Sequence, residues 1–184
     1  MNSLEEKTLR TENIFSGKVI SLQVEEVELP NGKTSKREII KHPGAVAVIA
    51  VNGEGKIVMV EQYRKALERT IVEIPAGKLE KGEQPEVCAV RELEEETGYV
   101  CGKIEWLISF YTSPGFADEL VHLYVATGLE KKEDAAETDE DEFVNVVEVT
   151  VEEALDLVRE QKIYDAKTAY AVQYLQMKKA LENK

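Results

Sequence analysis

The sequence has 184 residues, with 43% hydrophobic and 32% charged side chains, which suits one globular domain or one domain with a small appendage. Its formal net charge of −13 at pH 7 argues against a nucleic-acid-binding surface, and its longest apolar run, Ala45 to Val51, is far too short to span a membrane. The N-terminus, MNSLEEKTLR, lacks a signal-peptide pattern and the two cysteines give no disulfide framework, so we expect a cytoplasmic protein.

Residues 1–43 are expected to form an N-terminal antiparallel β segment. Two stretches, 11–29 and 34–42, look extended and are joined at Pro30-Asn31-Gly32-Lys33, where Asn-Gly is a strong turn signal. Because a two-stranded ribbon is marginal alone, it must lie on the main domain or on a second copy of the chain. Pro43-Gly44 marks the boundary, and residues 44–184 are expected to form the main domain.

Strands and helices alternate through this main domain. Strands are predicted over Ala45 to Val51, Lys56 to Tyr63, Ile104 to Tyr111, Glu119 to Ala126 and Phe143 to Val149. Helices are predicted from Pro85 to Gly98, from Thr150 to about Gln161, and from Asp165 onward. The last helix carries a stripe that we expect in the core, formed by Tyr170, Tyr174, Met177 and Leu181. The alternation predicts an α/β fold, a three-layer α/β/α sandwich with a mixed sheet.

The helix that begins at Pro85 carries an unusual group of carboxylates. Glu92, Glu95 and Glu96 lie on one face of it, because side chains three and four apart are neighbours. Like charges at i, i+4 destabilise a helix by roughly 0.2–0.5 kcal/mol a pair, and the macrodipole also opposes acidic groups in the last turn. A bound divalent cation removes both penalties, and Mg²⁺ prefers such oxygens. Charge and spacing alone equally allow a solvated acidic face.

A longer pattern around this helix resembles the Nudix box, the signature of Nudix hydrolases. Gly77 is followed after five residues by Glu83, and after seven more by Arg91-Glu92-Leu93-x-Glu95-Glu96-x-Gly98. Only Tyr99 departs from the pattern, since an aliphatic residue is more usual there. The resemblance implies the α/β/α sandwich and favours the metal site over the solvated face.

Three further features resemble the ADP-ribose pyrophosphatase branch of that family: Pro114, sixteen residues beyond Gly98, and the segments Gln62-Tyr63-Arg64 and Glu73 to Gly77. The resemblance implies Mg²⁺-dependent hydrolysis of ADP-ribose to AMP and ribose 5-phosphate, with Mn²⁺ as a possible substitute. It also implies a homodimer, because the N-terminal piece of this branch usually packs on a partner subunit. Two alternatives stay open: another nucleoside diphosphate derivative, such as a nucleotide sugar or a dinucleotide, or a non-catalytic sensor of an ADP-ribose-like ligand.

The resemblance also assigns roles to individual residues. Glu92 and Glu96 would bind the metal with the Ala76 carbonyl, and Glu95 would be a ligand or a bridge between ions. Arg91 would orient Glu95 or Glu73, and Glu83 would be structural or would support the metal ligands without binding the metal. Arg64 would bind phosphate with its planar fork, and the other residues expected at the substrate are Glu73, Pro114 and Gly115. A glutamate of the acidic loop Glu130 to Glu142 would take the proton from the attacking water; Glu140 is the first choice and Glu142 the second, against Glu137, Asp139 and Asp141.

Overall fold

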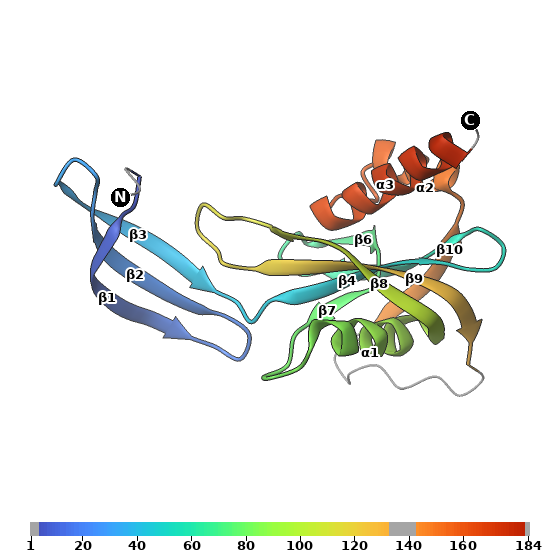
Figure 1. Ribbon diagram of the computed structural model, residues 1–184, viewed down its shortest axis with the longest axis horizontal. Helices are drawn as coiled ribbons and strands as arrows, with labels where there is room; N and C mark the ends of the chain where they lie inside the picture. Colours follow the sequence, from blue (N-terminus) through green and yellow to red (C-terminus); the bar gives the residue numbers. More distant parts are fainter. Residues whose placement is uncertain (1–3, 133–142, 183–184) are drawn as a thin grey trace. The chain divides into compact units, whose positions relative to one another are not determined.

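The computed structural model describes residues 4–132 and 143–182, and the chain divides into two compact units (Figure 1). The first unit comprises the chain up to Gly44 together with Phe110–Val121. The second unit comprises Ala45–Ser109 and the chain from His122 onward.

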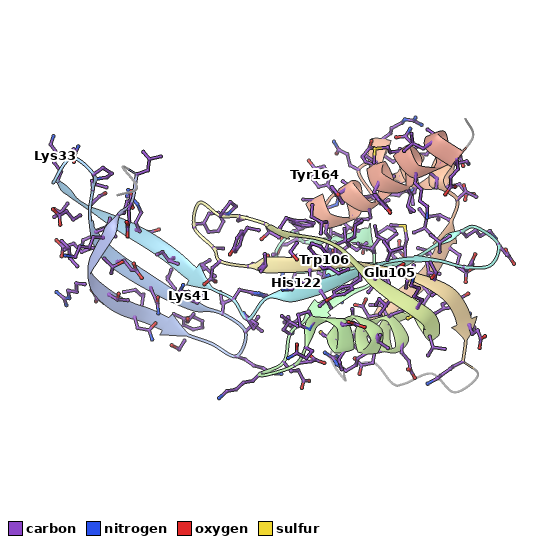
Figure 2. The ribbon with its side chains drawn as sticks, viewed as in Figure 1. Lys33, Lys41, Glu105, Trp106, His122 and Tyr164 are labelled. Atoms are coloured by element: carbon purple, nitrogen blue, oxygen red, sulfur yellow. The ribbon has the colours of Figure 1, made fainter. Side chains whose placement is uncertain are left out.

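The first unit is built on a three-stranded antiparallel sheet in the order β1-β2-β3, formed by β1 (Lys7–Ser16), β2 (Ser21–Glu28) and β3 (Thr34–Lys41). The predicted small antiparallel sheet is confirmed, but it has three strands and not two. A tight turn, closed by Gly17 N–H donating to the Ile20 carbonyl at 2.9 Å, divides the first predicted stretch into β1 and β2. The Asn-Gly turn is where it was expected, and Lys33 lies at this turn in Figure 2. The 110–121 segment joins the unit through a parallel bridge between Ile40 and Ala117.

The second unit holds a seven-stranded sheet in which β10-β5-β4-β9-β8 are neighbours, with β6 paired to β5 and β7 to β4. The strands are β4 (Ala45–Val51), β5 (Ile57–Arg64), β6 (Arg69–Glu73), β7 (Ala76–Lys78), β8 (Tyr99–Tyr111), β9 (Leu120–Lys131) and β10 (Val144–Val149). β5 runs antiparallel to β4, whereas β9 runs in the same direction as β4 in Figure 1. The sheet is mixed, as predicted. β9 is longer than predicted, so Glu130 belongs to a strand and not to the acidic loop.

Helices cover both faces of this sheet. α1 (Pro85–Thr97) lies on one face, and α2 (Val151–Arg159) and α3 (Ala166–Glu182) lie on the other, which confirms the predicted sandwich (Figure 1). α1 ends where expected, at Gly98 with φ 72, a left-handed conformation that glycine adopts without strain. The core joins β4 to α1 through buried residues that include Val46, Val48, Cys88, Ala89 and Leu93. Across the described residues, every helix is too short or too polar to traverse a lipid bilayer.

The predicted core stripe of α3 is wrong. Tyr170, Met177 and Leu181 are 39%, 57% and 62% exposed. The side that α3 buries is formed by Thr168, Ala171, Val172 and Leu175. Tyr174, the fourth residue of the predicted stripe, is half-buried, so the stripe as a whole does not face the core. Helical spacing identifies a stripe but not the direction in which it points.

Candidate active site

The last two turns of α1 bring carboxylates against the start of β7. Glu92 and Glu96 are buried, with 8% and 4% of their surface exposed. The Ala76 N–H donates a hydrogen bond to Glu96 Oε2 at 2.9 Å. A Cβ atom at Gly77 would stand 1.8 Å from Glu92 Cδ, so only glycine leaves room for this carboxylate. Gly77, at the start of the predicted motif, and Glu92 and Glu96, near its end, therefore lie close together in the structure.

Arg91 links the acidic side chains of α1. Its Nη1 donates to Glu95 Oε2 at 2.8 Å and to Glu92 Oε1 at 2.9 Å. Its Nε and Nη2 donate to the two oxygens of Glu83 at 3.0 and 3.1 Å, a bidentate pair. The hydrogen bond from Arg91 lowers the pKa of Glu83 to about 2. Of the two partners expected for Arg91, the structure places Glu95 beside it and not Glu73.

Glu73 instead accepts from two other cations. Arg64 Nε donates to its Oε2 at 2.6 Å, and Lys167 Nζ donates to its Oε1 at 2.5 Å. Glu73 is 3% exposed, whereas the Arg64 side chain is 39% exposed. Burial lowers the pKa of Arg64, but the hydrogen bond from Arg64 to Glu73 and the charges of Glu73, Glu96 and Asp165 raise that pKa above its usual value. Glu73 thus holds Arg64 at its Nε, and the charge of Glu96 in α1 also acts on this guanidinium.

Carboxylate oxygens suited to a hard cation lie along this part of α1, but those of Glu92 and Glu95 bond to Arg91. Among residues 4–132 and 143–182, no three Asp, Glu, His or Cys side chains are grouped closely enough to hold a metal ion. Arg91 holds Glu92 and Glu95 in its own hydrogen bonds. A cation would therefore compete with the guanidinium for these two carboxylates. In kind, the donors fit Mg²⁺ or Mn²⁺, which bind carboxylate and carbonyl oxygen.

A family model described as NUDIX domain matches residues 41–170. The chain belongs to the Nudix family. A second model, described as nucleoside diphosphate sugar hydrolase N-terminal domain, matches residues 6–40. The Nudix domain thus covers the carboxylates of α1, Arg64 and Lys167.

Relatives match this Nudix chain over nearly its whole length. It is 70% identical over 98% of its residues, and 97% of the relative, to a protein of Bacillus methanolicus named methanol dehydrogenase activator. It is 69% identical over 99% of its residues, and 98% of the relative, to an ADP-ribose pyrophosphatase of Bacillus subtilis (strain 168). A crystal structure of an ADP compounds hydrolase superposes with a TM-score of 0.83 over 96% of each chain; at 20% identity this likeness shows the fold.

The remaining predicted residues lie in other parts of the Nudix chain. Pro114 and Gly115 form an exposed turn between β8 and β9 and belong to the first unit, whereas the α1 carboxylates belong to the second. All five acidic candidates for the general base lie outside the described residues, namely Glu137, Asp139, Glu140, Asp141 and Glu142.

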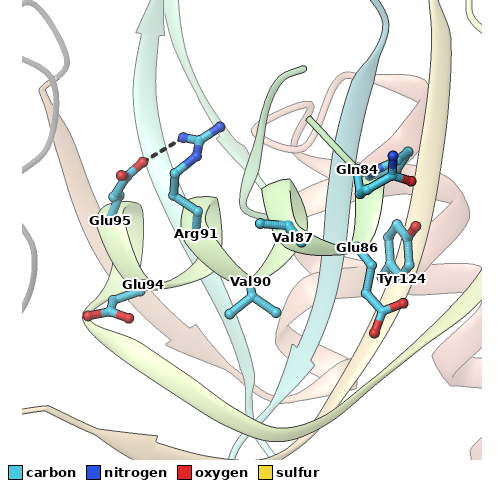
Figure 3. Close-up of a pocket in the computed structure, with 9 residues that line it drawn as sticks. Gln84, Glu86, Val87, Val90, Arg91, Glu94, Glu95 and Tyr124 are labelled. Carbon is cyan, nitrogen blue, oxygen red and sulfur yellow. Dashed lines mark hydrogen bonds and ion pairs between the residues drawn. The ribbon is translucent and has the colours of Figure 1, made fainter. Parts of the chain in front are cut away.

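A hollow runs along the outer side of the Nudix helix α1. Figure 3 shows Arg91 and Glu95 at one end of it and Tyr124, from β9, at the other. Val87 and Val90 are apolar residues that line it between these ends. Glu94 also lines this hollow, and Lys132 Nζ donates to Glu94 Oε1 at 2.6 Å. The hollow therefore reaches Glu95, one of the carboxylates of the Nudix box.

Sequence reasoning missed Lys167 and Asp165 as parts of the site. Asp165 was expected only to start the last helix, and Lys167 belongs to no motif. One signal was available: Lys167 stands in the first turn of α3, where the macrodipole disfavours a cation. A lysine at such a position needs an acidic partner, and here Glu73 and Asp165 are those partners.

Proposed function

We propose that this Nudix protein hydrolyses the diphosphate bond of ADP-ribose to AMP and ribose 5-phosphate with a divalent cation, Mg²⁺ or Mn²⁺. The carboxylate group of α1, assembled beside Ala76 and Gly77, is the observation that carries the proposal. The choice of substrate is supported by the 69% identity to a protein named ADP-ribose pyrophosphatase. A sensor would not need to keep every carboxylate of the Nudix box.

Each part of the site has a task in this proposal. Glu92, Glu95 and Glu96, with the Ala76 carbonyl, would hold the cation. When bound, the cation neutralises charge on the diphosphate and lowers the pKa of a coordinated water. Arg91 sets the positions of Glu92 and Glu95 through its hydrogen bonds. Glu140, or else Glu142, accepts the proton of the attacking water.

Substrate contacts are proposed for residues outside the carboxylate group. Arg64 binds a phosphate of the substrate through its terminal guanidinium nitrogens. Glu73 is buried behind Arg64, so it acts on the substrate through that arginine. Pro114 and Gly115 keep the contact role that the family resemblance implies.

The metal claim is tested by Glu96→Gln, with Glu94→Gln on the same helix as the matched control. AMP released from ADP-ribose at saturating Mg²⁺ is measured by chromatography. Glu96→Gln should lower kcat by more than roughly 100-fold, because losing even an outer partner of a metal ligand lowers activity about 10–100-fold. Near-normal turnover by Glu96→Gln would remove the metal site from the proposal.

The general base is tested separately, by comparing Glu140→Gln with Glu142→Gln. Loss of a positioned base should slow turnover by about 10²–10⁴-fold with little change in KM. If neither variant slows the reaction, the role passes to Glu95 in the Nudix box.

Two comparisons favour alternatives, and each has its own assay. The match of residues 6–40 to a nucleoside diphosphate sugar hydrolase segment favours a nucleotide sugar as substrate. A panel of ADP-ribose, nucleotide sugars and dinucleotides, run with Mg²⁺ and with Mn²⁺, ranks the substrates by kcat/KM.

The 70% identity to a methanol dehydrogenase activator favours a role in activating a dehydrogenase. Adding the protein to purified methanol dehydrogenase and following alcohol oxidation tests that role.

We also propose a homodimer in which residues 1–43 are exchanged between subunits and residues 44–184 form the hydrolase domain. Between residues 4 and 43 the structure buries only Val27, and every residue of β1 is exposed. A small sheet with so little covered surface needs a partner to be stable. Light scattering at micromolar concentration should give twice the mass of one chain.

A cytoplasmic location is proposed as well, with no membrane or nucleic-acid partner. Cys88 and Cys101 are both free thiols in the structure, as a reducing compartment would leave them. Cell fractionation should recover the protein with the cytoplasm, and recovery with the membrane or outside the cell would contradict the proposal.

A further inference from the structure

We propose that Lys167 is a positioning residue that keeps Arg64 available for phosphate by occupying one oxygen of Glu73. The inference rests on the proposed role of Arg64 in binding the substrate and adds a residue from α3 to that site. Lys167 would not touch the substrate; it would act through Glu73.

Glu73 stands between the two cations in the structure. Arg64 Nε and Lys167 Nζ donate to different oxygens of this carboxylate, at 2.6 and 2.5 Å. Exposure falls from 39% for the Arg64 side chain to 15% for that of Lys167 and 4% for that of Glu73. Glu73 is therefore the buried support, Lys167 beside it is half-buried, and Arg64 is the part that faces outward.

The support is fixed from behind by the start of α3. Asp165 Oδ1 accepts from Lys167 Nζ at 3.0 Å and from the Thr168 N–H at 3.1 Å. Thr168 Oγ1 in turn accepts from the Ile74 N–H at 3.1 Å. The first turn of α3 is thus bonded to two consecutive residues, Glu73 and Ile74, so the Glu73 carboxylate has little freedom to turn.

This arrangement decides how Arg64 pairs with Glu73. An arginine beside a carboxylate favours a bidentate pair in which two nitrogens bond two oxygens. Here Lys167 holds the second oxygen, and the only Arg64 nitrogen with a hydrogen bond to Glu73 in the described residues is Nε. The terminal nitrogens of Arg64 then stay outside the pair and can meet an anion. Without Lys167, Glu73 would draw Arg64 inward in a bidentate pair.

The test compares Lys167→Met with the conservative variant Lys167→Arg, and Lys179→Met on the exposed side of α3 is the control. Lys167→Met should raise KM for ADP-ribose roughly tenfold, the size typical of coupled neighbours, while kcat changes little. Lys167→Arg should restore most of the affinity, and Lys179→Met should behave as the wild type.

A double variant separates positioning from a general loss of structure. If Lys167 acts through Arg64, adding Lys167→Met to Arg64→Ala should raise KM no further. Multiplying effects, or a change in kcat alone, would overturn the inference. Because Lys167→Met leaves Glu73 with one fewer buried partner and can fail to fold, Asp165→Asn provides a second route. It keeps an oxygen for the Thr168 N–H and removes the charge behind Lys167, and an unchanged KM would likewise overturn the inference.

Calorimetric binding of inorganic pyrophosphate gives a readout that needs no catalysis. The same pattern is expected in its affinity: weaker binding by Lys167→Met, and no further weakening in the Arg64→Ala background. If the wild type releases no AMP from ADP-ribose but shows this pattern, the proposed substrate is wrong and the positioning role stands. If ADP-ribose is hydrolysed but Lys167→Met binds pyrophosphate like the wild type, the positioning role is wrong and the substrate stands.

Discussion

Gly77 is constrained by the space that Glu92 occupies. The atoms of the Glu92 carboxylate lie 1.8 to 2.3 Å from the place where a Cβ would stand. Real Cβ atoms do not approach other atoms so closely, so any side chain at Gly77 must push Glu92 away from its position beside β7. Glycine is therefore required at position 77 because a side chain would occupy the space of the Glu92 carboxylate, and not because the backbone must be flexible there.

We predict that Gly77→Ala lowers both stability and activity. The extra methyl group should destabilise the fold by about 1–3 kcal/mol, as overpacking does in other cores. Displacing Glu92 should also raise the Mg²⁺ concentration needed for half-maximal turnover. Urea unfolding and a metal titration of the reaction measure the two effects. Gly53→Ala, with no atom within 4 Å of its added Cβ, is the matched control.

The low pKa of Glu83 predicts how the free energy of unfolding depends on pH. Its pKa in the folded protein is about 2, below the usual 4.5, so between these values the unfolded chain binds more protons and acid favours unfolding. The stabilisation by Glu83 is complete above about pH 4.5 and is lost as the pH falls towards 2. The free energy of unfolding of the wild type should therefore exceed that of Glu83→Gln at pH 6, and the gap should narrow at pH 3. A gap that stays constant with pH would contradict this role.

At the scale of elements, α2 depends on its N-terminal cap. Thr150 Oγ1 accepts from the Glu153 N–H, and the Glu153 carboxylate accepts from the Thr150 N–H, which is the reciprocal capping box expected from the sequence. Thr150→Ala should destabilise the protein by about 0.5–2 kcal/mol in urea unfolding. The kinetic constants should not change, because α2 contributes no residue to the proposed site. Glu152→Gln, in the same turn but outside the box, should have a smaller effect on stability, and equal effects would argue against the cap.

Local signals made some elements predictable and left others undetermined. Pro85 and Gly98 mark the ends of α1 directly, and helical spacing alone places Glu92, Glu95 and Glu96 on one face. Which face of α3 points outward depends on its packing against the rest of the domain, and the sequence of the helix alone does not determine that packing. The pairing of Glu73 with Lys167 joins residues 94 apart in the chain, and neither belongs to a periodic pattern with the other. Long-range ion pairs of this kind need the tertiary structure.

At the scale of the whole molecule, the two units differ in how they are stabilised. The second unit buries a continuous core between its sheet and α1. In the first unit, apolar side chains stay exposed on β1, with Leu9 at 49%, Ile14 at 51% and Phe15 at 55%. Such a sheet gains little from the hydrophobic effect within one chain. Association with a second copy would supply the missing burial.

This difference predicts that β1 controls the oligomeric state. Covering one Leu side chain contributes about 1.5–3 kcal/mol, and a symmetric dimer covers it twice. Leu9→Glu in the full chain should therefore raise the dissociation constant of the dimer by more than about 100-fold, whereas Lys7→Glu on the same strand should not. A chain that begins at Pro43 should be monomeric in light scattering. The exchange model would be wrong if the wild type were already a monomer at micromolar concentration, or if Leu9→Glu kept the full dimer mass on dilution.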